Sequence, residues 1–226
     1  MTLTAAYIAL GTGVVVWAVL VRKLTAKPWE AQVAGGPTAA EEVRPAPARV
    51  GLWVFLAVVT SLFALFCSAY YMRMGHGHGE VHDWLHYSKP QVLWLNSALL
   101  ILASVAMQWA RNAVTRGQAA TARDALLLGG LLTLGFLAGQ LFAWRELREL
   151  PLFDPRNPAF AFFYLLTAVH AIHLLGGLFV WARTLVRLRR KDIELIDVRL
   201  SVELCSVYWH YLLLVWLVLF ALLLAT

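Results

Sequence analysis

Four ionisable side chains lie inside two long apolar segments near the C-terminus. His170 and His173 lie in the first segment, and Glu203 and His210 in the second. An apolar run of about 20 residues is long enough to cross the hydrocarbon core of a bilayer. Ionisable groups at that depth are costly and need partners, so each one marks a candidate functional site. Imidazole and carboxylate side chains could hold a haem iron or a lipid headgroup there, or pair with each other between helices.

Helical geometry groups these residues into two stripes. His170 and His173 share one side of a predicted helix, and Glu203, Ser206 and His210 share one face of the next. At 1.5 Å per residue, the first pair lies about 13–18 Å from the cytoplasmic end of its helix, and His210 about 10 Å from that end of the following one. The stripes can therefore face each other. The polar side chains of the two stripes either hydrogen-bond to one another in a helix contact or form a ligand-binding site. The spacing leaves both interpretations open.

The composition indicates an integral membrane protein, so membrane-spanning helices must position these two polar stripes. The 226 residues are 61% hydrophobic and 14% charged, with a mean hydropathy of +0.68, which leaves too little polar surface to cover a soluble globule. Ten Trp and seven Tyr are typical of aromatic belts at the two membrane interfaces. The net charge of +6 comes from residues in short loops beside the spans, so it indicates topology and not nucleic-acid binding.

We predict an all-α, polytopic membrane bundle with two parts. Residues 1–49 form an N-terminal transmembrane helix, retained and not cleaved as a signal peptide, with a flexible cytoplasmic linker rich in Pro, Ala and Gly. Residues 50–226 form a five-helix bundle. The six predicted spans are 5–21, 50–72, 92–110, 125–144, 159–182 and 204–225.

The positive charges predict the orientation. Most of the 19 Lys and Arg residues flank one side of the predicted spans, and this side is expected to be cytoplasmic. The exceptions are Arg73, Lys89, Arg145, Arg148 and Arg156. Both termini are then predicted to be periplasmic, in the inner membrane of a bacterium.

Two motifs resemble a known family. FYLLTAVHAIHLLGGL is similar to the Thr-Gly-x-His-Gly-x-His helix of subunit III of the haem–copper cytochrome c oxidases, and VELCSVYWHYLLLVW is similar to that family's final helix. Matching positions in these motifs are Thr167, His170, His173, Gly176, Gly177, Glu203, Tyr208, Trp209, His210 and Trp216. Weaker matches in the preceding helices are Leu93, Trp94, Asn96, Gln140 and Trp144.

The resemblance implies a function. It implies an accessory subunit without a redox cofactor of its own, packed beside subunit I, which carries the haem and copper, and associated with subunit II and small subunits. It also implies phospholipid bound in a cleft of the bundle. The residues expected to contact or support that cleft are His170, His173, Glu203, Trp209 and His210.

Two departures from the family pattern keep related functions open. Val59 and Leu213 stand where the family has carboxylates near its lipid sites and proton-handling face. A proton-collecting role is therefore not expected. One alternative is the related accessory subunit of a nitric oxide reductase or quinol oxidase. An alternative of another class is a haem-bearing membrane anchor, in which His210 and either His170 or His173 are the axial ligands.

The remaining candidates are weaker. A loop offers four histidines to copper or zinc, and we rank adventitious binding there above a dedicated site. These are His76, His78, His82 and His86. Cys67 and Cys205 both lie inside apolar segments and are expected to be inert thiols. The sequence has no nucleophile–base arrangement, phosphate-binding loop or Cys-x-x-Cys pair, so no catalysis by this chain alone is predicted.

Overall fold

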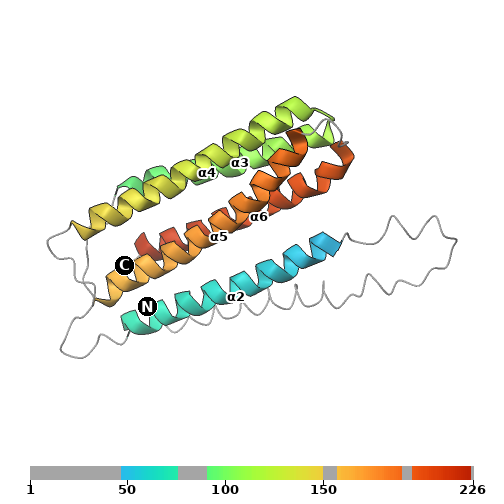
Figure 1. The fold of residues 1–226 in the computed structure, drawn as a ribbon. Helices are drawn as coiled ribbons and strands as arrows, with labels where there is room; N and C mark the ends of the chain where they lie inside the picture. Colours follow the sequence, from blue (N-terminus) through green and yellow to red (C-terminus); the bar gives the residue numbers. More distant parts are fainter. Residues whose placement is uncertain (1–46, 76–90, 150–156, 190–194, 225–226) are drawn as a thin grey trace, which may run out of the picture. The chain divides into compact units, whose positions relative to one another are not determined.

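The described part of the chain is helical. The computed structural model describes residues 47–75, 91–149, 157–189 and 195–224 (Figure 1). The helices in these ranges are α2 (Pro47–Gly75), α3 (Val92–Thr115), α4 (Ala119–Arg148), α5 (Pro158–Arg189) and α6 (Leu195–Leu224). All five are long and apolar enough to cross a membrane. The predicted all-α membrane fold is therefore confirmed, while the predicted first span and linker lie outside the described residues.

The helices extend beyond the predicted spans. Helix α4 begins at Ala119 and not at residue 125, and α6 begins at Leu195 and not at residue 204. Hydropathy marks only the part of a helix that lies in hydrocarbon, whereas backbone hydrogen bonding continues into the interface. Charged residues such as Arg123 and Arg199 therefore lie within helices.

The chain divides into two compact units, residues 1–61 and 62–226. In the second unit α3 packs against α4 and α6, and α5 packs against the same two helices. The main contacts of each of these four helices are thus with two others, and the four contacts close into a ring. This is the arrangement of a four-helix bundle, with its core between the helices.

The turn between α3 and α4 depends on one glycine. Gly117 has φ +75°, a conformation that a residue with a Cβ rarely adopts. The Gly117 amide donates to the carbonyl of Val114, and the Gln118 amide donates to that of Ala113. These two bonds form a Schellman motif, which satisfies carbonyls at the end of α3 and turns the chain directly into α4.

Helix α4 is held close to its neighbours by small residues. A Cβ added at Gly130 would lie 2.1 Å from Cζ2 of Trp181, and one added at Gly139 would lie 2.1 Å from Oδ1 of Asn96. Each glycine therefore receives a side chain from another helix in the space that its own side chain would fill. Close packing of this kind drives helix association in lipid. Lipid tails are as apolar as the helix surfaces, so the hydrophobic effect does not bring the helices together.

Helix α2 crosses the boundary between the two units. In its first part, Thr60 Oγ1 donates to the carbonyl of Leu56 and Ser61 Oγ to that of Ala57, so both hydroxyls are satisfied within the helix. Val59 is an apolar residue of this same stretch. In its second part, Tyr70 contacts Phe162 of α5 edge to face, with 5.5 Å between ring centroids.

Candidate functional site

Three tryptophans join the helices of the bundle through one repeated hydrogen-bond pattern. The indole N–H of Trp209 donates to Thr133 Oγ1 at 2.9 Å, linking α6 to α4. Trp216 donates to Ser97 Oγ at 2.9 Å, linking α6 to α3. In the third case, the indole N–H of Trp144 on α4 donates to the Thr167 hydroxyl on α5 at 3.0 Å.

Each accepting hydroxyl also donates to its own helix. Thr133 donates to the carbonyl of Gly129, Thr167 to that of Phe163, and Ser97 to that of Leu93. A hydroxyl carries one proton and two lone pairs, so this arrangement uses the proton within the helix and offers a lone pair to the neighbour. The indole N–H groups and the hydroxyls are thereby satisfied away from water, where unpaired polar groups are costly.

His170 lies at the centre of an aromatic cluster. Its side chain is 0% exposed, and its ring centroid lies 5.8 Å from that of Phe136 and 5.4 Å from that of Trp216. Phe63, in the second part of α2, lies edge to face at 6.4 Å. Neither ring nitrogen has a hydrogen-bond partner among the described residues. His170 therefore faces the core of the bundle.

His173 lies one turn further along α5 and contacts α6 through its backbone carbonyl. Its Nδ1 lies 2.7 Å from the carbonyl of Val169, and because a carbonyl oxygen only accepts, Nδ1 carries the proton. The His173 carbonyl accepts a hydrogen bond from the hydroxyl of Tyr208 at 3.0 Å. The Tyr208 ring lies against Gly177, where an added Cβ would approach it to 2.7 Å. A small residue at Gly177 thus lets α6 approach α5.

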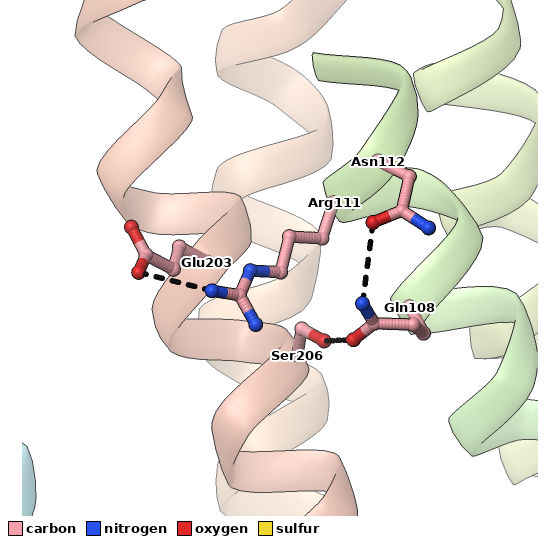
Figure 2. A network of polar contacts seen from close by, with 5 residues as sticks. All are labelled: Gln108, Arg111, Asn112, Glu203 and Ser206. Atoms are coloured by element: carbon pink, nitrogen blue, oxygen red, sulfur yellow. Dashed lines mark hydrogen bonds and ion pairs between the residues drawn. The ribbon is translucent and has the colours of Figure 1, made fainter. Parts of the chain in front are cut away.

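Glu203 and Ser206 turn toward α3, and Figure 2 shows the resulting network. Arg111 Nη2 lies 3.4 Å from Glu203 Oε1, with the two side chains 40% and 25% exposed. The Ser206 hydroxyl donates to Gln108 Oε1 at 3.3 Å, and Gln108 Nε2 donates to Asn112 Oδ1 at 3.2 Å. The network therefore joins the C-terminal part of α3 to the N-terminal half of α6.

His210 points out of the bundle. Its side chain is exposed, and Nδ1 donates to the carbonyl of Ser206, one turn earlier on α6, at 2.6 Å. The structure thus divides the predicted cluster among different surroundings. His170 and Trp209 are enclosed, Glu203 pairs with α3, and His210 faces outward. The Tyr208 bond joins the two histidine-bearing helices, α5 and α6.

Sequence reasoning missed two partners in these contacts. Arg111 was counted only as a cytoplasmic charge, although it lies in α3 at the depth at which Glu203 lies in α6. Thr133 carried no motif, and only the tertiary structure brings it to Trp209. Ser97 and Gln108, both on α3, contact Trp216 and Ser206 of α6.

The metal candidates lie elsewhere in the chain. In residues 47–75, 91–149, 157–189 and 195–224 no three His, Cys, Asp or Glu side chains gather in a way that could hold a metal ion. The loop histidines His76, His78, His82 and His86 lie outside these described ranges. Asn96 and Gln140, which the family resemblance singled out, do meet: Asn96 Nδ2 donates to Gln140 Oε1 at 3.4 Å between α3 and α4.

The fold and these contacts define a polytopic helical membrane protein whose core is fastened by tryptophan and hydroxyl side chains. Comparison with known proteins places it further: residues 14–225 match the family described as cytochrome c oxidase subunit III. The chain belongs to the cytochrome c oxidase subunit III family. It is therefore an accessory subunit of a haem–copper oxidase, in a complex with the catalytic subunits.

Curated relatives carry matching names. The cytochrome c oxidase subunit 3 of Corynebacterium diphtheriae is 28% identical over 179 residues, which cover 78% of this chain and 87% of that protein. The cytochrome c oxidase subunit 3 of Synechocystis is 27% identical, covering 76% of this chain and 72% of that protein. The cytochrome bo(3) ubiquinol oxidase subunit 3 of Buchnera aphidicola is 23% identical, covering 75% and 82%.

Proposed function

We propose that this chain serves a bacterial respiratory oxidase that reduces oxygen to water, and that it stabilises the catalytic subunit and binds phospholipid. The observation that carries the proposal is the match to subunit III over residues 14–225, nearly the whole chain. The chain would then lie in the inner membrane with both termini periplasmic, and subunits I and II would hold the haem and copper. The core of the bundle suits a stabilising role, because hydrogen bonds from Trp144, Trp209 and Trp216 join its helices.

Purification through a tag on this chain, in mild detergent, tests the assignment. We expect a large subunit containing haem and copper to co-purify, and the preparation to reduce oxygen with either cytochrome c or a quinol as the electron donor. The electron donor that supports oxygen reduction distinguishes a cytochrome c oxidase from a quinol oxidase. Turnover of nitric oxide in place of oxygen would support the nitric oxide reductase alternative. In cells that lack this chain, the oxidase should lose activity faster during turnover if the chain stabilises it.

The haem-anchor alternative makes a different prediction. In that case the isolated chain would keep a haem after separation from all other subunits, visible as a reduced-minus-oxidised difference spectrum. The rings of Phe136 and Trp216 surround His170, so a haem bound to His170 would require these rings to move. The close packing of this core therefore favours the accessory subunit.

The phospholipid proposal rests on the end of the bundle that carries Arg111 and Glu203. Glu203 lies five residues inside the span that begins at Val198, about 7–8 Å along the helix, and Arg111 lies four residues from the end of α3. This is the depth of the interface, and the partly exposed guanidinium suits a headgroup phosphate. His170 and Trp209, both enclosed, would support the site from within, together with the half-buried His173.

Native mass spectrometry of the complex tests the lipid proposal. Arg111→Gln should lower the amount of phospholipid retained, because it removes the charge that attracts the phosphate. Arg123→Gln is a matched control, since Arg123 lies near the start of α4 and pairs with its neighbour Asp124. Equal lipid retention in both variants would contradict a site at Arg111.

A further inference from the structure

His210 is an ionisable side chain that the bundle leaves exposed in the middle of a membrane-spanning helix. It lies 12 residues from Val198 and 14 from Leu224, the ends of the α6 span, and therefore about 18 Å or more from either end. Among residues 62–73, 91–149, 157–188 and 198–224, the other exposed charged side chains lie close to a helix end. His210 is about 10 Å deeper than Glu203, which lies at the interface.

The hydrogen bond to Ser206 fixes what His210 presents to its surroundings. Because the Ser206 carbonyl can only accept, Nδ1 of His210 carries the proton. In a neutral imidazole the other nitrogen, Nε2, is then a hydrogen-bond acceptor. Nothing in the described part of the chain donates to it. An exposed acceptor at this depth would lie in hydrocarbon, which offers no donor and makes such a group costly.

The neighbouring polar groups do not supply that donor. Glu203 pairs with Arg111 and Ser206 with Gln108, both on α3. The side chains that follow His210 on the outward side of α6 are Leu214 and Leu217, which are 60% and 44% exposed. The exposed surface is thus an apolar strip with one acceptor in it. Such a surface suits packing against another transmembrane helix. The side chains of that helix would cover the leucines, and one of its hydrogen-bond donors would reach Nε2.

We propose that the α6 face formed by His210, Leu214 and Leu217 contacts a transmembrane helix of another subunit of the oxidase complex, and that this helix donates a hydrogen bond to Nε2 of His210. A lipid headgroup is a poor occupant, because phosphates lie at the interface and not in the middle of a span. Hydroxyl, amide, indole and phenol groups are suitable donors on the partner helix. The inference rests on the proposed function in a respiratory oxidase complex, and adds the contact surface and its chemistry.

Photo-crosslinking in intact membranes tests the surface. A photoreactive phenylalanine analogue placed at Leu214 or Leu217 should form a covalent adduct with a protein of the purified haem–copper complex. Adducts with lipid alone, or with a protein absent from that complex, overturn the inference. If lipid adducts form while the haem–copper subunit still co-purifies through a tag on this chain, the proposed function stands and only the surface is wrong.

Substitution of His210 tests the hydrogen bond. His210→Phe keeps an aromatic ring but removes the acceptor, and should lower retention of the catalytic subunit during detergent washing about three- to tenfold, the factor for one interhelical hydrogen bond. His210→Gln keeps an acceptor oxygen and should restore much of the retention. Thermal unfolding of the released chain should be similar in both variants, since His210 lies outside the core. Equal retention in the two variants overturns the proposed donor.

Discussion

The indole–hydroxyl bond between Trp209 and Thr133 allows a quantitative test of what holds the bundle together. Both side chains are 0% exposed, and the bond joins α6 to α4 at 2.9 Å. Thr133→Val preserves the shape of the side chain and removes the acceptor. The Gly129 carbonyl also loses the Thr133 hydroxyl, but the helical backbone still bonds to it.

The expected loss follows from leaving the indole N–H unpaired. A buried donor without a partner destabilises a protein by about 1–3 kcal/mol. Hydrogen bonds between membrane helices contribute less, about 0.6 kcal/mol on average and up to about 1.7, because the unfolded chain in the membrane also finds partners. We therefore expect Thr133→Val to lower the free energy of unfolding by about 1–2 kcal/mol.

A double-mutant cycle separates the bond from its surroundings. Thr133→Val, Trp209→Phe and the double variant are unfolded in mixed detergent micelles, and the free energies of unfolding are compared. The cavity left by Trp209→Phe appears in both arms and cancels. A coupling energy near 1 kcal/mol is expected. A coupling below about 0.3 kcal/mol, within the error of additivity, would refute the claim that this bond fastens α6 to α4.

Three further substitutions test packing and charge. Gly130→Ala places a Cβ 2.1 Å from the Trp181 ring, which must shift, so it should destabilise the chain by about 1–3 kcal/mol in the same assay. Gly176→Ala meets nothing within 4 Å and should be neutral or stabilising by up to about 1 kcal/mol; a loss like that of Gly130→Ala would contradict the packing argument. Glu203→Gln breaks a partly exposed ion pair with Arg111 and should change the free energy of unfolding by less than about 1 kcal/mol. The effect should be smaller in high salt, which screens exposed charges. A larger change that salt does not reduce would show that the pair is more deeply desolvated than its exposure indicates.

Much of the fold was predictable because the bilayer imposes strong rules. Apolar length alone located the five described helices, and the predicted bundle class is confirmed. Motif spacing also found residues that do meet, such as Asn96 with Gln140. Helix ends were less well predicted, because α4 and α6 continue past the hydrocarbon into segments whose charges suggested loops. Hydropathy reports depth, and it does not report where backbone hydrogen bonding stops.

The candidate site was harder to predict because helical periodicity gives a direction relative to one helix axis only. His170 and His173 share a side of α5, and Glu203 and His210 share a face of α6. Periodicity could not say that His170 would be enclosed by aromatic rings, or that Glu203 would turn to Arg111 on α3. These outcomes depend on how each helix is rotated against two neighbours at once.

The sequence by itself determined the class of the protein, the location of the five described membrane-length helices and the polar residues carried into them. These properties follow from local composition, since the transfer of each side chain into hydrocarbon depends mainly on that side chain. Only the tertiary structure decided which polar group meets which. Thr133 accepts a hydrogen bond from the indole of Trp209, while His210 faces outward and its Nε2 meets no donor among the described residues. The reason is physical: hydrogen bonds between helices depend on the rotation and register of packed helices, and close contacts at glycines such as Gly130 and Gly139 set both.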